Sequence, residues 1–341
     1  MQQQQSEKRA LVTGATGFVG SRLVHWLLRD GIPVRALVRS SGRGEALLPA
    51  EVELVEGDLT TEFDSGVAAG CDVVYNLATT HNVAGGDYAS HRAVHVDGTR
   101  RLLEASRAAG VQRFVHCSTM AVHGPVAEEP GDETWPHRPE DPYQVSKSEG
   151  EKLVAEYGAT TGLPVTIARP TAIYGPGDLR LLKLFDMLNR GRFVMLGAGR
   201  IRYQMVYIDD LVRGLRRMAR RRAAVGEAFI LGGAESLPLR ELVGLIAQTL
   251  GASPPRFRAP VWPVELAGAV CEAVCRPFRI KPPIYRRRVA FFTKSRAFSI
   301  RKARDVIGFD PRVDLRTGLA RTAHWYREHS MLAVALGLGV A

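Results

Sequence analysis

Residues 13–20, with the sequence TGATGFVG, stand between a short apolar run at residues 10–12 and the pattern GSRLVHWLLRDG, which is typical of a helix. The glycines of this stretch have the spacing G-x-x-G-x-x-G. Gly14 would allow a tight turn, Gly17 would let the backbone approach a phosphate group, and Gly20 would permit close packing of the helix. The N-terminus of that helix would add free N–H groups and the positive end of its dipole. A glycine triplet alone is weak evidence, so its interpretation depends on the rest of the chain.

The first two thirds of the chain alternate between Val- and Leu-rich runs, which predict strands, and amphipathic runs, which predict helices. The predicted strands are RALVTG, PVRALVR, VELVEGDL, CDVVYNLA, RFVHCST and PVTIARP. One predicted helix is closed by Gly31, and another, TRRLLEASRAAG, by Gly110. This alternation predicts an α/β fold with a doubly wound parallel sheet. Such a sheet binds ligands at the carboxyl ends of its strands.

After Pro170 the pattern loosens, and we expect a second, smaller α/β region. We predict a dinucleotide-binding Rossmann region over residues 7–175, to which residues 204–232 return, and a substrate-binding region formed by residues 176–203 and 233–330. GEAFILGG predicts a strand, and PLRELVGLIAQTLG a helix that begins near Ser236. The apolar stretch from Pro260 predicts an amphipathic helix over a pocket. Glu265 and Glu272 share one face of this helix and argue against a membrane span.

The positive charge of the chain is concentrated in one segment. The net charge is +11, and residues 276–304 contain eleven Lys or Arg residues and no Asp or Glu. The pattern RGLRRMARRR adds a helical face with Arg213, Arg216, Arg217 and Arg220. These charges predict either a solvated basic surface or attraction to phosphate groups, on a ligand or on an anionic membrane. No aromatic ladder or DNA-binding motif accompanies them, so we do not expect nucleic acid as a partner.

Cysteine usage and the two ends of the chain bear on the compartment. The four cysteines are too scattered for a disulfide framework and form no ligand pattern with histidine, so we expect free thiols, a reducing compartment and no metal site. The N-terminal MQQQQSEKRA lacks the apolar core of a signal peptide. The C-terminal MLAVALGLGVA is shorter than the roughly 20 residues of a membrane span. We therefore expect a cytoplasmic protein, and a homodimer.

A second motif follows the glycine stretch. In YQVSK, Tyr143 and Lys147 are four residues apart and so share a helix face. Upstream, the predicted strand RFVHCST ends in Ser118 and Thr119, at the edge where a ligand would lie. A glycine turn, strand-end hydroxyls and a Tyr/Lys pair in this order resemble the extended branch of the short-chain dehydrogenase/reductase superfamily. That branch contains nucleotide-sugar epimerases and dehydratases, dihydroflavonol-type reductases and 3β-hydroxysteroid dehydrogenases.

The resemblance covers nearly the whole chain. It is carried also by EGDL, NLA, VDGTRRLLEA, ARPTAIYGPGD, VYIDDL and KARDVIGFDPRVDLRTGLARTAHWYRE. It implies that Tyr143 is the general acid/base, that Lys147 binds the nicotinamide ribose and lowers the pKa of Tyr143, and that Thr119 binds the reacting oxygen, with Ser118 as the alternative. Bringing a tyrosine from a pKa of about 10 to near 7 takes roughly 4 kcal/mol, which Lys147 and a positive nicotinamide ring could supply.

The resemblance also implies which residues contact the dinucleotide. Asp58 would lie near the adenine amino group, or would be a strand-end turn residue. Arg39 stands where NAD sites usually have an acidic residue. Because a guanidinium can bind a 2′-phosphate, we favour NADP as the cofactor, with NAD possible. The full set of implied cofactor contacts is Gly14, Thr16, Gly17, Phe18, Val19, Arg39, Asp58, Leu59, Leu77, Ala78, Ser118, Tyr143, Lys147 and Pro170.

The chain departs from the family pattern at three places, and two of these departures bear on the substrate. Many nucleotide-sugar members have Asn at the place of Ala172, and Arg-Asp-Phe at residues 203–205, where this chain has YQM. Two phosphate contacts are thus missing. The third departure, His95 in place of Asn, has no interpretation from the sequence, and His81 lies either in a loop or in the pocket.

We therefore predict an NAD(P)-dependent oxidoreductase that interconverts a secondary alcohol and a ketone on an apolar, steroid- or terpenoid-like small substrate, most like the 3β-hydroxysteroid dehydrogenase type. The alternative enzyme is a nucleotide-sugar 4-epimerase, dehydratase or reductase. A non-catalytic dinucleotide sensor is the alternative from another class. The intact set of Thr119, Tyr143 and Lys147 argues against a sensor.

Overall fold

The computed structural model describes residues 8–80, 87–126, 130–255, 257–275 and 291–332. In these residues the main sheet has seven strands, and every neighbouring pair in it is parallel. Across the sheet the strands are β10 (Ala228–Leu231), β6 (Val165–Pro170), β5 (Arg113–Cys117), β4 (Val73–Asn76), β1 (Ala10–Thr13), β2 (Val34–Val38) and β3 (Glu53–Glu56). The predicted doubly wound parallel sheet is confirmed.

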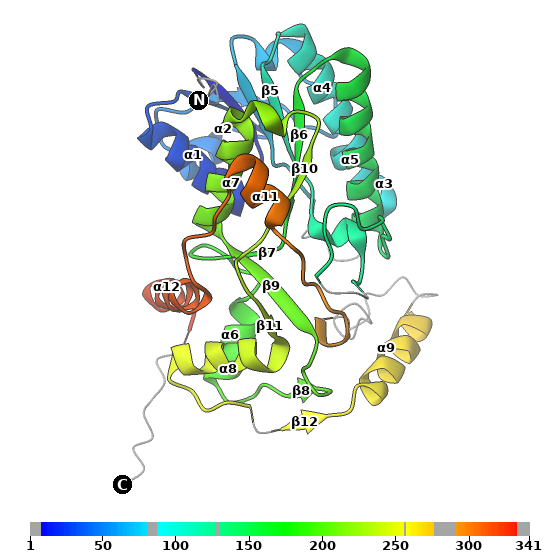
Figure 1. Cartoon of the computed structure of the whole chain (residues 1–341). Helices are drawn as coiled ribbons and strands as arrows, with labels where there is room; N and C mark the ends of the chain where they lie inside the picture. The colour runs from blue at the N-terminus through cyan, green and yellow to red at the C-terminus, as the bar shows by residue number, and fades with distance from the viewer. Residues whose placement is uncertain (1–7, 81–86, 127–129, 256, 276–290, 333–341) are drawn as a thin grey trace.

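Helices cover both faces of this sheet (Figure 1). On one face lie α1 (Phe18–Arg29), α7 (Ile208–Arg220) and α11 (Arg301–Ile307), and on the other lie α4 (Thr99–Ala108) and α5 (Pro142–Thr161). A separate cluster of buried apolar side chains fills each side, which explains why the strands carry apolar residues on both faces. Shorter elements in the same part of the chain are α2 (Ser41–Leu47), η1 (Ser65–Ala68), α3 (Tyr88–Arg92), η2 (Ala93–Gly98), η3 (Met120–His123) and η4 (Arg222–Ala224).

The strand order fixes where a ligand can bind. Strand β1 lies between β2 and β4, so the chain leaves β1 toward one edge of the sheet and later returns to its other side. Such a switch point opens a crevice beyond the carboxyl ends of the strands, because the two connecting segments run off in opposite directions. The glycine stretch directly follows β1 and therefore lies in this crevice.

The second region is built around its own small sheet and apolar core. Strand β9 (Arg202–Tyr207) pairs with β7 (Ala172–Tyr174) in parallel and with β11 (Ser236–Pro238) in antiparallel fashion. The helix expected near Ser236 begins later, at Leu239, because residues 236–238 form strand β11. The other elements are α6 (Leu182–Asn189), β8 (Met195–Leu196), α8 (Leu239–Leu250), β12 (Arg258–Ala259), α9 (Trp262–Cys275) and α12 (Leu315–Glu328).

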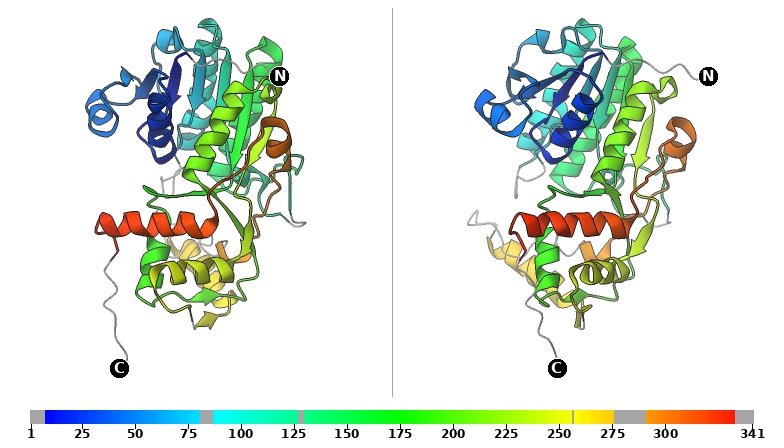
Figure 2. Two further views of the ribbon diagram at one scale, coloured as in Figure 1. Left: turned by 60° about the vertical axis from the view of Figure 1, so that its left-hand side comes forward. Right: turned by 90° about the vertical axis from the view of Figure 1, so that its left-hand side faces the viewer.

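The two regions exchange segments rather than following one another along the chain. Within the predicted returning segment 204–232, α7 packs against the main sheet and β10 is one of its strands, whereas β9 is a strand of the small sheet. Later, α11 packs against β10 and α7, and α12 lies across the boundary of the two regions and packs against α8 (Figure 2). The predicted limits of the two regions remain a prediction.

Part of the basic surface is neutralised within the chain. On α7, Arg213 pairs with Asp210, and the buried guanidinium of Arg216 pairs with Asp30. Of the basic segment 276–304, only residues 291–304 lie among those described. Within the described part of the chain, no helix combines the length and apolar character needed to cross a membrane.

Candidate active site

The turn after β1 is compact because two of its glycines have no room for a side chain. Gly14 has φ +66°, and a Cβ there would lie 2.9 Å from the backbone of Leu77 and Ala78 at the end of β4. A Cβ on Gly20 would lie 2.1 Å from the carbonyl oxygen of Gly14. The N–H of Gly17 donates to that same carbonyl at 2.9 Å and closes the turn. The glycines therefore press the start of α1 against β1 and β4.

The start of α1 has the features of an anion site. Gly17 is the N-cap residue, no side chain caps the helix, and the first turn holds no acidic residue. The first N–H groups of a helix have no partner inside the helix, so they are left to bind a ligand. Backbone donors at a cavity wall and a glycine cradle fit a dinucleotide pyrophosphate.

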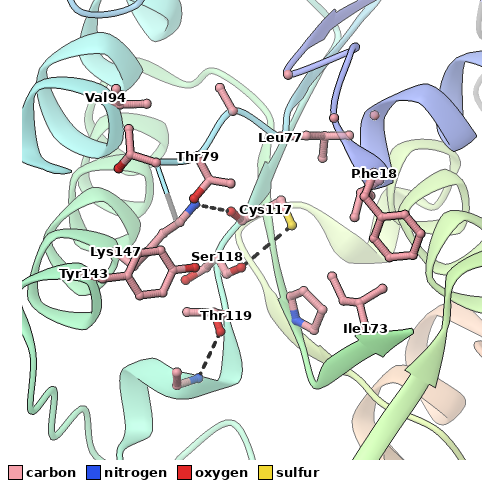
Figure 3. A pocket seen from close by; sticks show the side chains of 18 of the residues that line it. Phe18, Leu77, Thr79, Val94, Cys117, Ser118, Thr119, Tyr143, Lys147 and Ile173 are labelled. Atoms are coloured by element: carbon pink, nitrogen blue, oxygen red, sulfur yellow. Dashed lines mark hydrogen bonds between the residues drawn. The ribbon is translucent and has the colours of Figure 1, made fainter. Parts of the chain in front are cut away.

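A cavity of about 1150 Å³ extends from this turn across the carboxyl ends of the parallel strands (Figure 3). Its far wall comes from α5, from β7 and from the segment 291–296. The volume exceeds the roughly 300–1,000 Å³ of most small-molecule sites, so it can hold two molecules. Every site residue expected from the sequence lines it, namely Gly14, Thr16, Gly17, Phe18, Val19, Arg39, Asp58, Leu59, Leu77, Ala78, Ser118, Thr119, Tyr143, Lys147 and Pro170.

Two arginines and one carboxylate lie at the end of the cavity beside β2 and β3. Arg39 directly follows β2, Arg43 lies in α2, and both are exposed. Neither forms an ion pair with a carboxylate among the described residues, which leaves both charges to the cavity. Asp58 lines the cavity, but its Oδ1 also accepts hydrogen bonds from the N–H and hydroxyl of Thr60, at 2.8 and 2.9 Å. Asp58 thus lines the cavity, as a contact with adenine would require, and it also stabilises the turn at the end of β3.

Helix α5 begins where the sequence places strong start signals. The Asp141 side chain accepts a hydrogen bond from the N–H of Gln144 at 2.8 Å, and Pro142 occupies the first turn. This start directs Tyr143 and Lys147, one turn apart, into the cavity from the same face (Figure 3).

The Tyr143 hydroxyl is difficult to ionise in the chain alone. Burial raises the pKa of Tyr143 to about 12, although a hydrogen bond with Thr79 and the charge of Arg180 act to lower it. The lowering toward 7 that the resemblance implied is therefore not provided by the chain alone. A positive nicotinamide ring, the other charge in that expectation, belongs to the cofactor.

Lys147 is almost fully buried, with 3% of its surface exposed. Its Nζ donates to the backbone carbonyl of Cys117 at 2.9 Å, at the carboxyl end of β5. Burial lowers the pKa of Lys147 from its ordinary value. The carbonyl uses one of the three ammonium donors, and the others remain available on the cavity side.

The two strand-end hydroxyls differ in their hydrogen bonding. The Thr119 Oγ1 accepts from the N–H of Ala121 at 3.2 Å as the cap of η3, and its own O–H can still donate. The Oγ of Ser118 is buried and has no hydrogen-bond partner among the described residues. Both hydroxyls line the cavity, so the geometry leaves either of them able to meet a substrate.

A buried ionic cluster holds α5 against β6 behind these residues. The Nε of Arg169 donates to Oε1 of Glu151 at 2.9 Å, and His137 lies 3.4 Å from the same carboxylate. Burial acts to raise the pKa of Glu151, but the hydrogen bonds from His137 and Arg169 outweigh it and lower the pKa to about 2. The cluster therefore stays ionic and fixes the helix that carries Tyr143.

The far wall contains residues that the sequence did not single out as site residues. They are Thr79, Thr80, Gln144, Ile173, Arg180, Phe291, Thr293, Lys294 and Arg296, and Tyr203 joins them. Tyr203 and Phe291 meet edge to face with their ring centroids 5.3 Å apart. The only signal for this wall in the sequence was the charge of the segment 276–304, because residues 291–296 reach the cavity only through tertiary packing.

The departures from the family pattern can now be located. Gln204 is buried and structural, since its side chain donates to the Gly233 carbonyl and accepts from the N–H of Phe298. Ala172 lines the cavity. None of the α9 residues whose side chains the structure describes lines the cavity, and the expectation that this helix covers the pocket remains a prediction. His81 lies outside the described residues.

Comparisons with known proteins agree with this site. The model of the NAD dependent epimerase/dehydratase family matches residues 10–232. The chain belongs to this family. It is thus an NAD(P)-dependent enzyme of the extended short-chain dehydrogenase/reductase type, a family of oxidoreductases, epimerases and dehydratases.

The relatives of this family member differ in activity. A dTDP-glucose 4,6-dehydratase of Streptomyces griseus is 32% identical over 335 residues, with 94% of each chain covered. A 3-beta-hydroxysteroid dehydrogenase of Mycolicibacterium neoaurum is 30% identical over 348 residues, covering 96% of this chain and 94% of its own. The solved structure of MoeE5 in complex with UDP-glucuronic acid and NAD is 27% identical, has a TM-score of 0.74, and covers 94% of this chain and 99% of its own.

Proposed function

We propose that this family member interconverts a secondary alcohol and a ketone with a nicotinamide dinucleotide, NADP in preference to NAD. The observation that carries the proposal is the meeting of Thr119, Tyr143 and Lys147 in one cavity with the glycine turn. A purely structural role for these three residues would not require that they line the same cavity as an uncapped helix N-terminus.

The residues present fit the cofactor. The N–H groups at the start of α1 would hold the pyrophosphate, Lys147 the nicotinamide ribose, and Arg39 with Arg43 a 2′-phosphate. The bound cofactor would supply the hydride acceptor or donor. Both arginines stand without a carboxylate partner among the described residues, which supports NADP as the preferred cofactor.

Residues of the chain itself would transfer the proton in this reaction. Tyr143 holds a proton at Oη and would deliver it to the carbonyl oxygen during reduction, or take it from the hydroxyl during oxidation. Thr119 would orient that oxygen through its free O–H. The Lys147 ammonium, buried in the same cavity, favours the phenolate form of Tyr143 during the exchange.

The substrate end of the cavity is partly apolar. Ala172, Ile173, Tyr203 and Phe291 form an apolar and aromatic wall, which supports a steroid- or terpenoid-like substrate body. Arg296 adds a positive charge next to Tyr203, and no carboxylate within the described part of the chain pairs with it. We therefore expect the preferred substrate to combine an apolar body with a polar or anionic group.

A second candidate function is conversion of a nucleotide sugar by epimerisation, dehydration or reduction. The specific observation in its favour is that Arg180 and Arg296 both face the cavity and could meet a diphosphate. The Asp178 carboxylate already pairs with Arg180 at 2.8 Å, so Arg296 is the stronger of the two. Relatives named for both kinds of reaction are about equally similar to this chain.

One experiment separates the two candidates. The purified protein is incubated with NADP⁺ or NAD⁺ and a panel of sterol and terpenoid secondary alcohols, and reduced cofactor is followed by its absorbance. A parallel panel contains dTDP-glucose and UDP-glucose, analysed for changed sugars by chromatography. Net cofactor reduction by an apolar alcohol supports the proposal. A changed sugar without net reduction supports the second candidate and overturns the first.

A further inference from the structure

His95 is a buried residue that the proposed reaction has not yet used. It lies in η2, a turn of π-helix that joins α3 to α4 without interrupting the helical backbone. Only 1% of its surface is exposed. Wide turns of this kind are rare and often occur at functional sites.

The hydrogen-bond partners of His95 define where its ring proton lies. The backbone N–H of Thr80 points at Nε2, 3.3 Å away, and a backbone N–H can only donate. Nε2 is therefore an acceptor, and the neutral ring carries its proton on Nδ1. Nδ1 lies 2.9 Å from Oγ of Ser146, whose hydroxyl in turn donates to the Tyr143 carbonyl at 2.9 Å. The ring is thus held with Nε2 as its basic atom.

Thr79 connects this basic atom to Tyr143. The Thr79 Oγ1 lies 3.2 Å from Nε2 of His95 and, with Nε2 acting as an acceptor, donates its hydroxyl proton to it. The same side chain is hydrogen-bonded to the Tyr143 side chain. Both Thr79 and Tyr143 line the cavity (Figure 3). A continuous path of hydrogen bonds therefore runs from the Tyr143 Oη through Thr79 to His95.

We propose that His95 is a positioning and proton-relay residue that exchanges a proton with Tyr143 through the Thr79 hydroxyl. For alcohol oxidation, the Tyr143 proton passes to Thr79 Oγ1 while the Thr79 proton passes to His95 Nε2, which becomes an imidazolium. The resulting phenolate then takes the proton of the substrate hydroxyl, and the bound oxidised nicotinamide cofactor would supply the acceptor for the hydride that leaves the carbon bearing that hydroxyl. Reduction of a ketone uses the same steps in reverse, with the imidazolium as proton donor.

The burial of Tyr143 explains why a nearby proton acceptor would assist the reaction. Burial of the ring favours the neutral phenol, so direct loss of its proton is costly. A proton that moves only as far as His95 stays within the same site. The catalytic use of this path rests on the proposed function, whereas the hydrogen bonds themselves do not.

Three ionisable groups on the elements packed against η2 have partners other than His95. Arg92 on α3 pairs with Asp97 on η2 and Glu149 on α5, at 3.5 and 3.8 Å. Lys147 donates to a backbone carbonyl, and on α4 Arg101 donates to the Leu59 carbonyl. Among the described residues, the aromatic rings in contact with the His95 ring are those of His91 and Tyr143.

His91 provides a matched control. Its ring stacks on that of His95 with 5.8 Å between centroids, and it meets the ring of Tyr143 edge to face at 5.9 Å. Its Nδ1, however, is bound to the hydroxyl of Thr80 at 2.6 Å, which is not the residue that contacts Tyr143. Packing effects should therefore appear in variants of both histidines, and relay effects only in variants of His95.

The first test needs no substrate. In protein with ¹⁵N-labelled histidine, the His95 signals are identified as those lost in His95→Asn, and their shifts report which nitrogen is protonated. We expect a neutral ring with its proton on Nδ1 above neutral pH, and a shift of the Nε2 signal in Thr79→Val. A proton on Nε2, or no response to Thr79→Val, would overturn the relay whatever the reaction is.

The second test uses the substrate found in the activity panel. His95→Asn should lower the rate of alcohol oxidation about 100-fold near pH 7, the lower end of acid–base effects, and remove a limb of the pH profile without changing cofactor affinity. His91→Asn should stay within about twofold of wild type. Equal losses and an unchanged pH profile in both variants would make His95 structural only. A wild type without oxidoreductase activity would contradict the proposed function and leave the NMR result to decide the relay.

Discussion

Tyr143 is the residue on which the proposed reaction depends most directly. In Tyr143→Phe the ring keeps its packing against the histidines, but the proton at Oη is gone. We expect a loss of turnover of about 10²–10⁴-fold, the usual range of acid–base catalysis, with nearly unchanged cofactor affinity. Steady-state kinetics and a fluorescence titration of the cofactor measure the two quantities. More than a tenth of wild-type turnover would show that Tyr143 is not the acid/base.

Arg39 should determine which cofactor binds more tightly. Its exposed guanidinium directly follows β2 and lines the cavity, so it can pair with the 2′-phosphate of NADPH. We expect tighter binding of NADPH than of NADH, and a loss of about 1.5–3 kcal/mol of NADPH binding in Arg39→Asp, since that is the range for charged hydrogen bonds. Calorimetric titration of both cofactors tests this. Equal affinities in the wild type, or a preference for NADPH that survives in the variant, would count against it.

At this scale the sequence predicted the residues that belong to local motifs. Tyr143 and Lys147 share a helix face by spacing alone, and Thr119 ends a strand. Arg296 and Thr79 were not predicted, because segments far apart in the chain bring them to the cavity. The interpretation of His95 likewise needed its three hydrogen-bond partners, none of which follows from its neighbours in sequence.

Among the elements, the start of α1 carries the clearest steric requirement. In Gly20→Ala the added methyl would overlap the Gly14 carbonyl, so helix and turn must separate. We expect lower stability and at least a tenfold weaker cofactor affinity. Gly244→Ala, in open space on α8, is the control and should be neutral or stabilising by up to about 1 kcal/mol. Denaturation curves and cofactor titrations of both variants decide; equal behaviour would contradict the steric argument.

Periodicity predicted the long elements and failed for the short ones. The strands of the main sheet are rich in apolar residues and alternate with helices along the chain, so their pattern is distinctive. Strands β7, β9 and β11 are three, six and three residues long, each contains partly buried residues, and they pair with strands that are distant in sequence. Their existence depends on tertiary contacts that a local pattern does not contain.

For the molecule as a whole, buried neutral histidines should make stability depend on pH. Burial lowers the pKa of His116 to about 3 and that of His123 to about 4, with further lowering by Lys147 and Arg169 respectively. In the unfolded chain both histidines would titrate near pH 6.5. Below this pH the unfolded state therefore binds protons at both histidines, whereas the folded state keeps them neutral. At pH 5 each histidine should cost about 2 kcal/mol of unfolding free energy relative to pH 8.

Urea denaturation at pH 8 and pH 5 checks this expectation. The drop should be about halved in His116→Asn and unchanged in the control His324→Asn, whose side chain is 71% exposed. Glu151 does not affect the comparison between pH 8 and pH 5. Because its pKa is lowered, its contribution to the free energy of unfolding is lost only at much lower pH. A wild type equally stable at both pH values would contradict the assignment of these histidines as neutral.

The surface around α9 leads to a prediction about membranes. Trp262 and Leu266 on α9 and Phe257 before it are 66%, 58% and 73% exposed, and the basic stretch 276–288 follows directly in the sequence. Apolar side chains beside Lys and Arg promote binding to anionic bilayers. We expect sedimentation with anionic but not neutral vesicles, weakened by salt and by Trp262→Ala, but not by the control Val225→Ala. No sedimentation with either lipid would leave a solvated basic surface.

The late return of the chain to the main sheet has a consequence for biosynthesis. Residues 291–328 supply a wall of the cavity, the helix α11 that covers β10, and the buried Tyr326, whose hydroxyl donates to the Asp178 carbonyl. A ribosome makes these residues after β10 and α8. The nascent chain therefore leaves the apolar faces of β10 and α8 uncovered for a time after their own synthesis, and it can assemble a complete cavity only after residues 291–296 have left the exit tunnel.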